Sequence, residues 1–176
     1  MAVTKFSSPI PTYLDKRSVE DVASAVAERF NFGIGDPVEA IVSGLGGELK
    51  YGWNSLDEVD GGSIEASSFH NFTIFISDLT SPKRDRFTMA HELGHLFLHL
   101  PKLQEKNESA VMRATRRIDK SDEMQQRAEW EANWFAGQLL MPKAEFKDCV
   151  EKFGLEHASR VFNVSQQAAN VRNSSI

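Results

Sequence analysis

The sequence predicts an α+β fold in which a small three-stranded sheet packs on helices and a short helical module ends the chain. Three observations indicate this: alternating apolar runs before residue 77, amphipathic helical patterns on both sides of them, and short helical patterns after residue 154. We expect a main domain over residues 1–153 and a small helix-turn-helix-like tail over residues 154–176, packed on the core.

Two helices are predicted before the strands. The first begins at Ser18 and ends around residues 31–33, and its apolar face consists of Val19, Val22, Ala23, Val26 and Phe30. We expect this helix to pack beneath the functional site. Asp36 and Pro37 suit the cap and first turn of a shorter helix, which the glycines within residues 44–47 end.

Three extended segments follow these helices. Alternating apolar residues predict one strand over residues 49–53, and β-rich runs predict two more over residues 63–69 and 72–76. Because only two residues separate the last two runs, we expect them to form a hairpin. Residues 54–62 are mostly polar and are expected to form a loop.

A third helix follows the hairpin directly. Ser81 suits its cap and Pro82 its first position, whereas Pro101 is expected to end it beyond about Leu100. Its polar stripe consists of Arg84, Thr88, His91, His95 and His99, and we expect the histidines to face a cleft rather than the core. Gly94 destabilises a helix interior by about 1 kcal/mol relative to Ala, which suggests that another element approaches closely there.

The second half of the chain is mainly helical. Residues 101–120 are charged and show little periodicity, so we expect a mobile surface loop beside the cleft, with its basic side chains in solvent. A long, largely apolar helix begins near Ser121 and ends at residues 141–142. Two short helices are expected after Gly154.

Bulk composition excludes several classes of protein. The chain has 176 residues, of which 41% are hydrophobic and 26% charged, enough for one sizeable core. Its net charge of -5 makes nucleic acid an unlikely partner. The single cysteine, Cys149, excludes an internal disulfide and a thiolate metal cluster, and is expected to pack between helices. Without a targeting signal or a long apolar run, we expect a cytoplasmic protein without membrane contact.

The segment His91-Glu92-Leu93-Gly94-His95 carries the strongest chemical signal. On a helix, His91 and His95 lie one turn apart on the same face, so both rings can bind one zinc ion. Glu92 then lies beside the ion, where it can take a proton from an activated water and pass it to a leaving amine. This is the chemistry of peptide hydrolysis.

A third protein ligand must come from elsewhere in the chain. The metzincin pattern would require glycine at position 98 and histidine at position 101, but the chain has Leu98 and Pro101. The other common solution is a glutamate from a later helix. Glu129 and Glu131 are the two candidates.

The two glutamates lie on different helix faces. Glu131 shares a polar face with Arg127 and Gln138, where a carboxylate can stay hydrated or pair locally. The face of Glu129 also carries Asn133, Ala136 and Leu140. Burying an unpaired carboxylate there would cost several kcal/mol unless a cation compensates it. We therefore prefer Glu129 as the metal ligand and keep Glu131 as the alternative.

Several other polar residues have less specific roles. Asn133 and His99 are expected to support the ligands or line the cleft, and an ordinary structural role is nearly as well supported for Asn133. His70 and His157 lack ligand spacing and are left out of the metal site. The candidates for stabilising an oxyanion, which the sequence does not rank, are Tyr13, Tyr51, His99 and His157.

Two blocks of the sequence resemble the ImmA/IrrE family of metallopeptidases. They are Arg86–His99 (RFTMAHELGHLFLH) and Glu129–Ala136 (EWEANWFA), the latter followed by Leu139–Pro142. The resemblance covers roughly residues 18–153. It implies a zincin-like metallopeptidase core of the gluzincin type, with His91, His95 and Glu129 as zinc ligands and Glu92 as general base.

The resemblance also implies a biological role. Members of this family are typically cytoplasmic peptidases of bacteria or their mobile elements that act on helix-turn-helix repressors and thereby regulate transcription. The expected partner is such a repressor or an antitoxin. Apart from the resemblance, we hypothesise that an extended substrate pairs alongside the strand over residues 72–76.

Two alternatives remain open. The chain could be a non-catalytic, metal-stabilised regulator that acts by binding a partner. It could also bind DNA through its C-terminal helices, although Arg172 is the only charged residue within 166–172. We expect the tail to serve in packing or protein docking instead.

Overall fold

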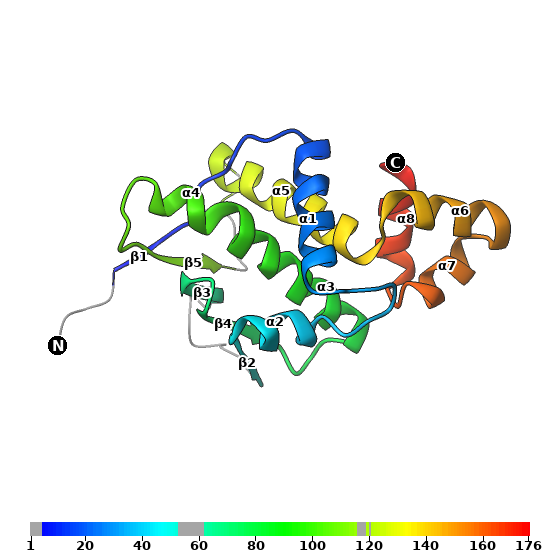
Figure 1. The fold of residues 1–176 in the computed structure, drawn as a ribbon, viewed down its shortest axis with the longest axis horizontal. Coiled ribbons are helices and arrows are strands. Elements are labelled where there is room, and N and C mark those ends of the chain that lie inside the picture. The colour runs from blue at the N-terminus through cyan, green and yellow to red at the C-terminus, as the bar shows by residue number, and fades with distance from the viewer. Residues whose placement is uncertain (1–4, 53–61, 116–118, 120) are drawn as a thin grey trace.

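The computed structural model describes residues 5–52, 62–115, 119 and 121–176 and has a mixed α+β fold (Figure 1). Its strands are β1 (Phe6–Ser7), β2 (Glu48–Tyr51), β3 (Gly62–Ser68), β4 (Asn71–Ile76) and β5 (Val111–Thr115). Its helices are α1 (Lys16–Arg29), α2 (Glu39–Leu45), α3 (Pro82–Gly94), α4 (Leu100–Gln104), α5 (Glu123–Leu140), α6 (Lys143–Phe153), α7 (Leu155–Val161) and α8 (Gln166–Ser174). A π-helical turn, η1 (His95–His99), joins α3 to α4. The predicted α+β class is confirmed, whereas the loop predicted over residues 54–62 lies outside the described residues apart from Gly62.

Within the described residues, five strands form one mixed sheet in the order β1-β5-β3-β4-β2. β3 is antiparallel to β4 and β5, whereas the outer strands β1 and β2 are parallel to their neighbours. β3 and β4 form the predicted hairpin, with Ile64 opposite Ile74. The prediction of a three-stranded sheet was wrong, because β1 and β5 extend the sheet beyond β3.

β5 lies in the charged segment for which the sequence predicts a mobile surface loop, so that prediction was wrong too. Met112 and Ala114 of β5 are buried, whereas Arg113 between them forms an ion pair with Glu65 of β3 at 2.6 Å. Only these two apolar residues point inward, and charged residues flank the strand. An alternation this short does not stand out in the sequence. Residues 116–118 and 120 of the segment lie outside the described residues.

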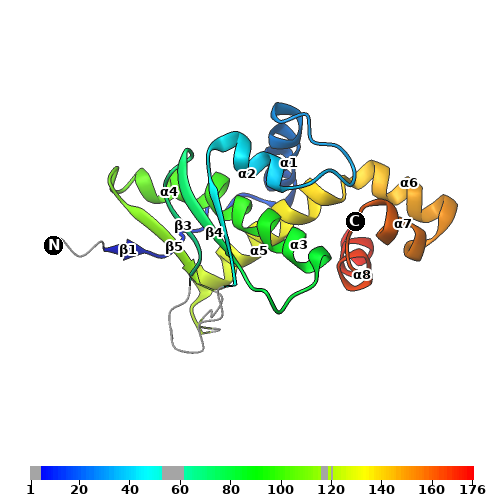
Figure 2. The ribbon, with the colours of Figure 1, turned by 90° about the horizontal axis from the view of Figure 1, so that it is seen from below.

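The helices α3, α4 and α5 lie together on one side of the strands, and α1 packs against α5 (Figures 1 and 2). The core between these layers is apolar and includes the buried side chains Ile64, Ile74, Met89, Leu93, Met112, Phe135 and Leu139. α1 begins slightly before the predicted Ser18, because the carboxylate of Asp15 accepts a hydrogen bond from the Ser18 amide at 2.8 Å and caps the helix. The sequence therefore located this helix well but began it two residues late.

Gly94 confirms the predicted close approach of another element. A Cβ atom on Gly94 would lie 3.0 Å from the Cα and 3.1 Å from the carbonyl oxygen of Ala132 in α5. These are backbone atoms, which cannot rotate away as a side chain can. The glycine therefore allows α3 and α5 to pack at the short distance that brings their side chains together at the site.

Helical structure continues past Pro101, which corrects the predicted end of the third helix. In η1 the amide of Leu100 donates to the carbonyl of His95, five residues back, instead of four as in an α-helix. The wider turn resets the helical register, so that Pro101 lies in the first turn of α4. A proline is tolerated there because the first amides of a helix need no partner within it.

The C-terminal helices α6, α7 and α8 form the end of the molecule opposite β1 (Figures 1 and 2). Buried Arg172 of α8 joins them to the rest, since its guanidinium donates to the carbonyl of Met141 at 3.0 Å and to Glu20 of α1 at 2.6 Å. The separate tail predicted from residue 154 stays a prediction. In the part of the chain that the structure describes, no helix combines the length and apolar character needed to cross a membrane.

Candidate metal centre

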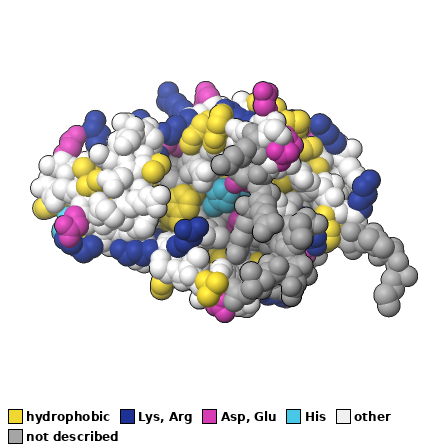
Figure 3. Space-filling model, turned by 180° about the vertical axis from the view of Figure 1, so that it is seen from behind, with side chains coloured by type: hydrophobic (Ala, Val, Ile, Leu, Met, Phe, Trp, Pro, Cys, Tyr) yellow, Lys and Arg dark blue, Asp and Glu magenta, His cyan; other side chains and the backbone are white. Residues whose placement is uncertain are grey.

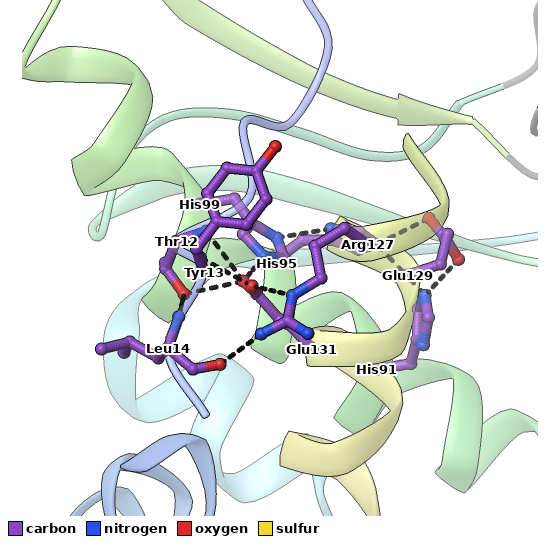
Figure 4. Close-up of polar contacts among 9 residues, drawn as sticks. All are labelled: Thr12, Tyr13, Leu14, His91, His95, His99, Arg127, Glu129 and Glu131. Carbon is purple, nitrogen blue, oxygen red and sulfur yellow. Dashed lines mark hydrogen bonds and ion pairs between the residues drawn. The ribbon is translucent and has the colours of Figure 1, made fainter. Parts of the chain in front are cut away.

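Three side chains, one each from α3, η1 and α5, converge at one place in the structure. His91 lies in the last turn of α3, His95 follows at the start of η1, and Glu129 extends from α5 (Figure 4). The two Nε2 atoms are 3.1 Å apart, and each lies 3.2 Å from a carboxylate oxygen of Glu129. The structure thus brings together the three residues that the sequence suggests as metal ligands.

The spacing of these three donors fits a zinc ion. Ligands bound at about 2.0–2.2 Å in a tetrahedron lie roughly 3.3 Å from one another, close to the separations found here. The ring orientations fit as well, because the Nδ1 atom of His91 lies 3.0 Å from Oδ1 of Asn133, and Nδ1 of His95 lies 2.9 Å from Nδ1 of His99. When the Nδ1–H group of each ring donates a hydrogen bond, the Nε2 lone pairs of His91 and His95 point toward the same position. A cation bound there removes the repulsion between the two lone pairs.

A cleft of about 310 Å³ opens beside these donors. The ends of β4 and β5 form one wall and α3 forms the other, and both His91 and Glu129 reach the cleft. Glu92 also lines it, although its side chain is largely buried. Figure 3 shows a histidine side chain recessed in the middle of one face of the molecule, beside acidic and apolar side chains. Glu92 therefore lines the same cleft as His91 and Glu129.

The expectation that all the histidines face a cleft was only partly right. His91 keeps 14% of its side chain exposed and lines the cleft, whereas His95 and His99 are 1% and 0% exposed. The helix face that carries His95 and His99 packs against α5, which covers both rings. The polar stripe of this helix therefore lines the cleft at His91 and enters the core at His95 and His99.

The glutamate preferred from the sequence reaches the histidines, but the reason given for it was wrong. Glu129 is 21% exposed at the cleft, whereas Glu131 is fully buried. Glu131 is not hydrated. It pairs with Arg127 at 2.9 Å, as the polar face suggested, and with His99 at 3.1 Å. The structure therefore groups Glu129 with the candidate ligands and places Glu131 behind them.

The environment changes the pKa values of the cluster in different directions. Burial disfavours the charged form of His91, but the hydrogen bond to Glu129 and the negative charge of Glu92 outweigh it and raise the pKa of His91. Burial dominates for His95 and lowers its pKa to about 3. Burial also opposes ionisation of Glu129, yet the hydrogen bonds from both histidines hold its pKa well below the usual range. The cluster therefore favours an ionised carboxylate beside a neutral His95, the forms in which these groups bind metals.

Sequence reasoning missed several polar residues of the cleft, and two of them lie on the same helix as His91. Arg84 and Thr88 of α3 both line the cleft, yet neither was considered as a functional residue. None of the candidates for stabilising an oxyanion, which were Tyr13, Tyr51, His99 and His157, is among the described residues that line the cleft. The available signal for Arg84 and Thr88 was their position on the histidine stripe, since Thr88 lies one turn and Arg84 two turns before His91.

The two histidines that were left out lie away from the cluster. Nδ1 of His70 makes a hydrogen bond to the carbonyl of Leu45 at 2.9 Å, and the ring of His157 packs on Phe153. Both have ordinary structural contacts.

A comparison with protein families matches residues 58–174 to peptidase M78, described as the IrrE N-terminal-like domain. The match covers about two thirds of the chain and includes α3 and α5, which carry the three donors. The chain belongs to the ImmA/IrrE metallopeptidase family. No curated protein matches it. The ImmA/IrrE match continues through α8, beyond residue 153, where the resemblance was expected to end, and it begins after α1 and α2.

Proposed function

We propose that this chain is a zinc endopeptidase of the gluzincin type, with a zincin-like core. One observation carries the proposal: the donors of His91, His95 and Glu129 converge at zinc spacing beside a cleft that Glu92 also lines. Membership of a metallopeptidase family supports the same reading.

In this proposal, His91, His95 and Glu129 hold the zinc ion. When bound, the ion would polarise the scissile carbonyl and the attacking water. Glu92 accepts a proton from the attacking water as its oxygen bonds to the carbonyl carbon. It then delivers that proton to the leaving nitrogen, so that the carbon–nitrogen bond breaks to release a neutral amine and not an amide anion. Asn133 and His99 hold the two imidazole rings in the orientation and tautomer that this arrangement requires.

The path of the substrate differs from the one expected from the sequence. β4 cannot accept a peptide along residues 73–76, because β2 already pairs with it there and β3 occupies its other side. A groove of about 650 Å³ between α3, α5 and α8 instead adjoins the cleft, and Arg84, Phe87 and Thr88 line both. We therefore place the incoming polypeptide in this groove.

The substrate that we propose is a helix-turn-helix repressor or an antitoxin, cleaved in the cytoplasm to regulate transcription. Family resemblance alone supports this choice. The rival idea, that the C-terminal helices bind DNA, has less support. Arg172, the only charged residue of α8, is buried and paired with Glu20, so it is not available to a phosphate.

Replacing Glu92 with Gln tests the proposal. The Glu92→Gln protein should keep its zinc, because the three ligands are intact, but lose roughly 100- to 10,000-fold in cleavage of a helix-turn-helix repressor or antitoxin, chosen from those encoded next to this gene if any are. Glu105→Gln, which changes an exposed glutamate of an α4 ion pair, is the matched control and should cleave normally. Normal cleavage by Glu92→Gln would overturn the assignment of the base. Full regulatory activity without any cleavage would instead favour a non-catalytic, metal-stabilised regulator.

A further inference from the structure

A chain of buried side chains leads from His95 away from the cleft into the interior (Figure 4). Nδ1 of His95 lies 2.9 Å from Nδ1 of His99, and Nε2 of His99 lies 3.1 Å from a carboxylate oxygen of Glu131. All three side chains are almost completely shielded from solvent. Their protons are therefore arranged by one another and not by water.

The carboxylate at the end of this chain sets the direction of each hydrogen bond. An ionised Glu131 only accepts, so Nε2 of His99 must donate to it. Nδ1 of a neutral His99 then carries a lone pair, and Nδ1 of His95 must donate to it. This leaves the lone pair of His95 on Nε2, the atom that faces His91 and Glu129. Two rings away, Glu131 thus selects the tautomer of His95 that can bind a metal.

Glu131 is also the anchor of the N-terminal segment, defined here as residues 12–14. Its carboxylate accepts hydrogen bonds from the amide of Thr12 at 2.9 Å, the hydroxyl of Thr12 at 2.7 Å and the amide of Tyr13 at 2.8 Å. Arg127, which pairs with Glu131, also donates to the carbonyl of Leu14. Tyr13 has a φ of 59°. Residues other than glycine adopt this left-handed backbone conformation only where their surroundings impose it.

We propose that His99 and Glu131 are positioning residues for His95, and that docking of the N-terminal segment and metal binding stabilise each other through them. The inference rests on the proposed metal site, but not on peptidase activity. Without the segment, Glu131 loses three donors and becomes accessible to water, so His99 is free to adopt its other tautomer. Metal binding at His95 favours the tautomer of His99 that donates to Glu131, and by linkage each event strengthens the other by the same factor.

The zinc affinity of the folded variants shows whether His99 and Glu131 position His95 or only stabilise the fold. His99→Phe keeps a ring but removes both hydrogen bonds, and Glu131→Gln removes the charge. Zinc affinity, measured by competition with a chelating dye, should fall roughly 10- to 100-fold in each. His99→Asn restores an acceptor for His95 and should recover part of the loss.

The matched control is Glu20→Gln, which breaks the buried pair with Arg172 far along the chain from the site. It should lower the thermal stability but leave zinc affinity within about twofold of the wild type, since losing a distant contact does not alter the ligands. The visible spectrum of the Co²⁺-substituted protein gives a second readout, because it should change in His99→Phe and remain unchanged in Glu20→Gln.

Hydrogen exchange tests the link to the N-terminus. Zinc should slow exchange of the Thr12 and Tyr13 amides in the wild-type protein but not in His99→Phe. Should Glu131→Gln fail to fold, Thr12→Val, which removes one donor, should still lower zinc affinity measurably. Folded His99→Phe and Thr12→Val proteins with wild-type zinc affinity would overturn the inference. A wild-type protein that binds no zinc would overturn this inference and the proposed function together, whereas zinc binding without cleavage would overturn only the latter.

Discussion

The two histidines of the motif have the same spacing and sequence context, yet they occupy different environments. His91 borders the cleft and has a raised pKa, because Glu129 and Glu92 stabilise its charged form despite burial. His95 is enclosed by α5 and has a pKa lowered to about 3. His91 is therefore the ligand with which protons compete, whereas His95 is already in its metal-binding form at any moderate pH.

This difference predicts how zinc affinity depends on pH. Below the raised pKa of His91, binding zinc displaces one proton, and neither His95 nor the ionised Glu129 adds a second. Affinity should therefore fall about tenfold for each unit of pH between about pH 6 and pH 4. Zinc titrations at several pH values measure this slope. A slope of about two would show that both histidines are protonated in the metal-free protein, contrary to the environment described for His95.

At the scale of elements, the site depends on the contact between α3 and α5. His91 and His95 follow the axis of α3 into η1, and Glu129 comes from α5, so their distances depend on how closely the two helices pack. Gly94 permits the short separation from Ala132. The π-helical turn then brings His99 beside His95, with ring centroids 4.9 Å apart.

Gly94→Ala should therefore weaken both the fold and the site. Alanine favours helix by about 1 kcal/mol, but its Cβ would meet the backbone of Ala132, and overpacking of this kind typically destabilises by about 1–3 kcal/mol. We expect a net loss of stability in denaturant unfolding, together with weaker zinc binding as α5 moves away. Gly154→Ala is the contrast for zinc binding. Its φ of 84° makes alanine strained and so destabilising, but its Cβ meets no neighbouring atom, so zinc affinity should stay unchanged. A Gly94→Ala protein with wild-type stability and zinc affinity would contradict the role given to this contact.

Single residues and elements differ in how far the sequence could predict them. The spacing of His91, Glu92 and His95 is local, so helical geometry alone brought them to the site. The choice of Glu129 came from helix-face reasoning that misjudged its burial, because a sequence does not show which face of α5 meets α3. The strand β5 was missed since its inward side consists of only two apolar residues. The contact of Thr12 with Glu131 joins residues 119 positions apart, and no spacing rule reaches that far.

At the scale of the whole molecule, the candidate metal centre joins parts of the chain that are distant in sequence. In the sequence His91 and His95 follow β4, and Glu129 comes only after β5. The N-terminal segment contacts Glu131, which lies behind these candidate ligands. An ion bound there links α3 to α5 directly. Metal binding should therefore stabilise the complete fold and not only the cleft.

Removing the metal should accordingly lower thermal stability. A ligand present at about 1000 times its dissociation constant stabilises the folded state by about 4 kcal/mol, so chelation should lower the melting temperature by roughly 8–16 °C. Differential scanning calorimetry with and without excess zinc measures this shift. His95→Ala should melt at the same temperature in both conditions. An equal response of His95→Ala and the wild type to zinc would mean that the stabilising ion binds elsewhere.

The most direct test of the central claim is a crystal structure of the zinc-loaded protein with anomalous data collected at the zinc absorption edge. The account predicts a peak about 2.0–2.2 Å from Nε2 of His91, Nε2 of His95 and a carboxylate oxygen of Glu129, with Glu92 beside it and Glu131 still paired with His99. A zinc ion bound by Glu131, or no zinc between the two histidines, would contradict it.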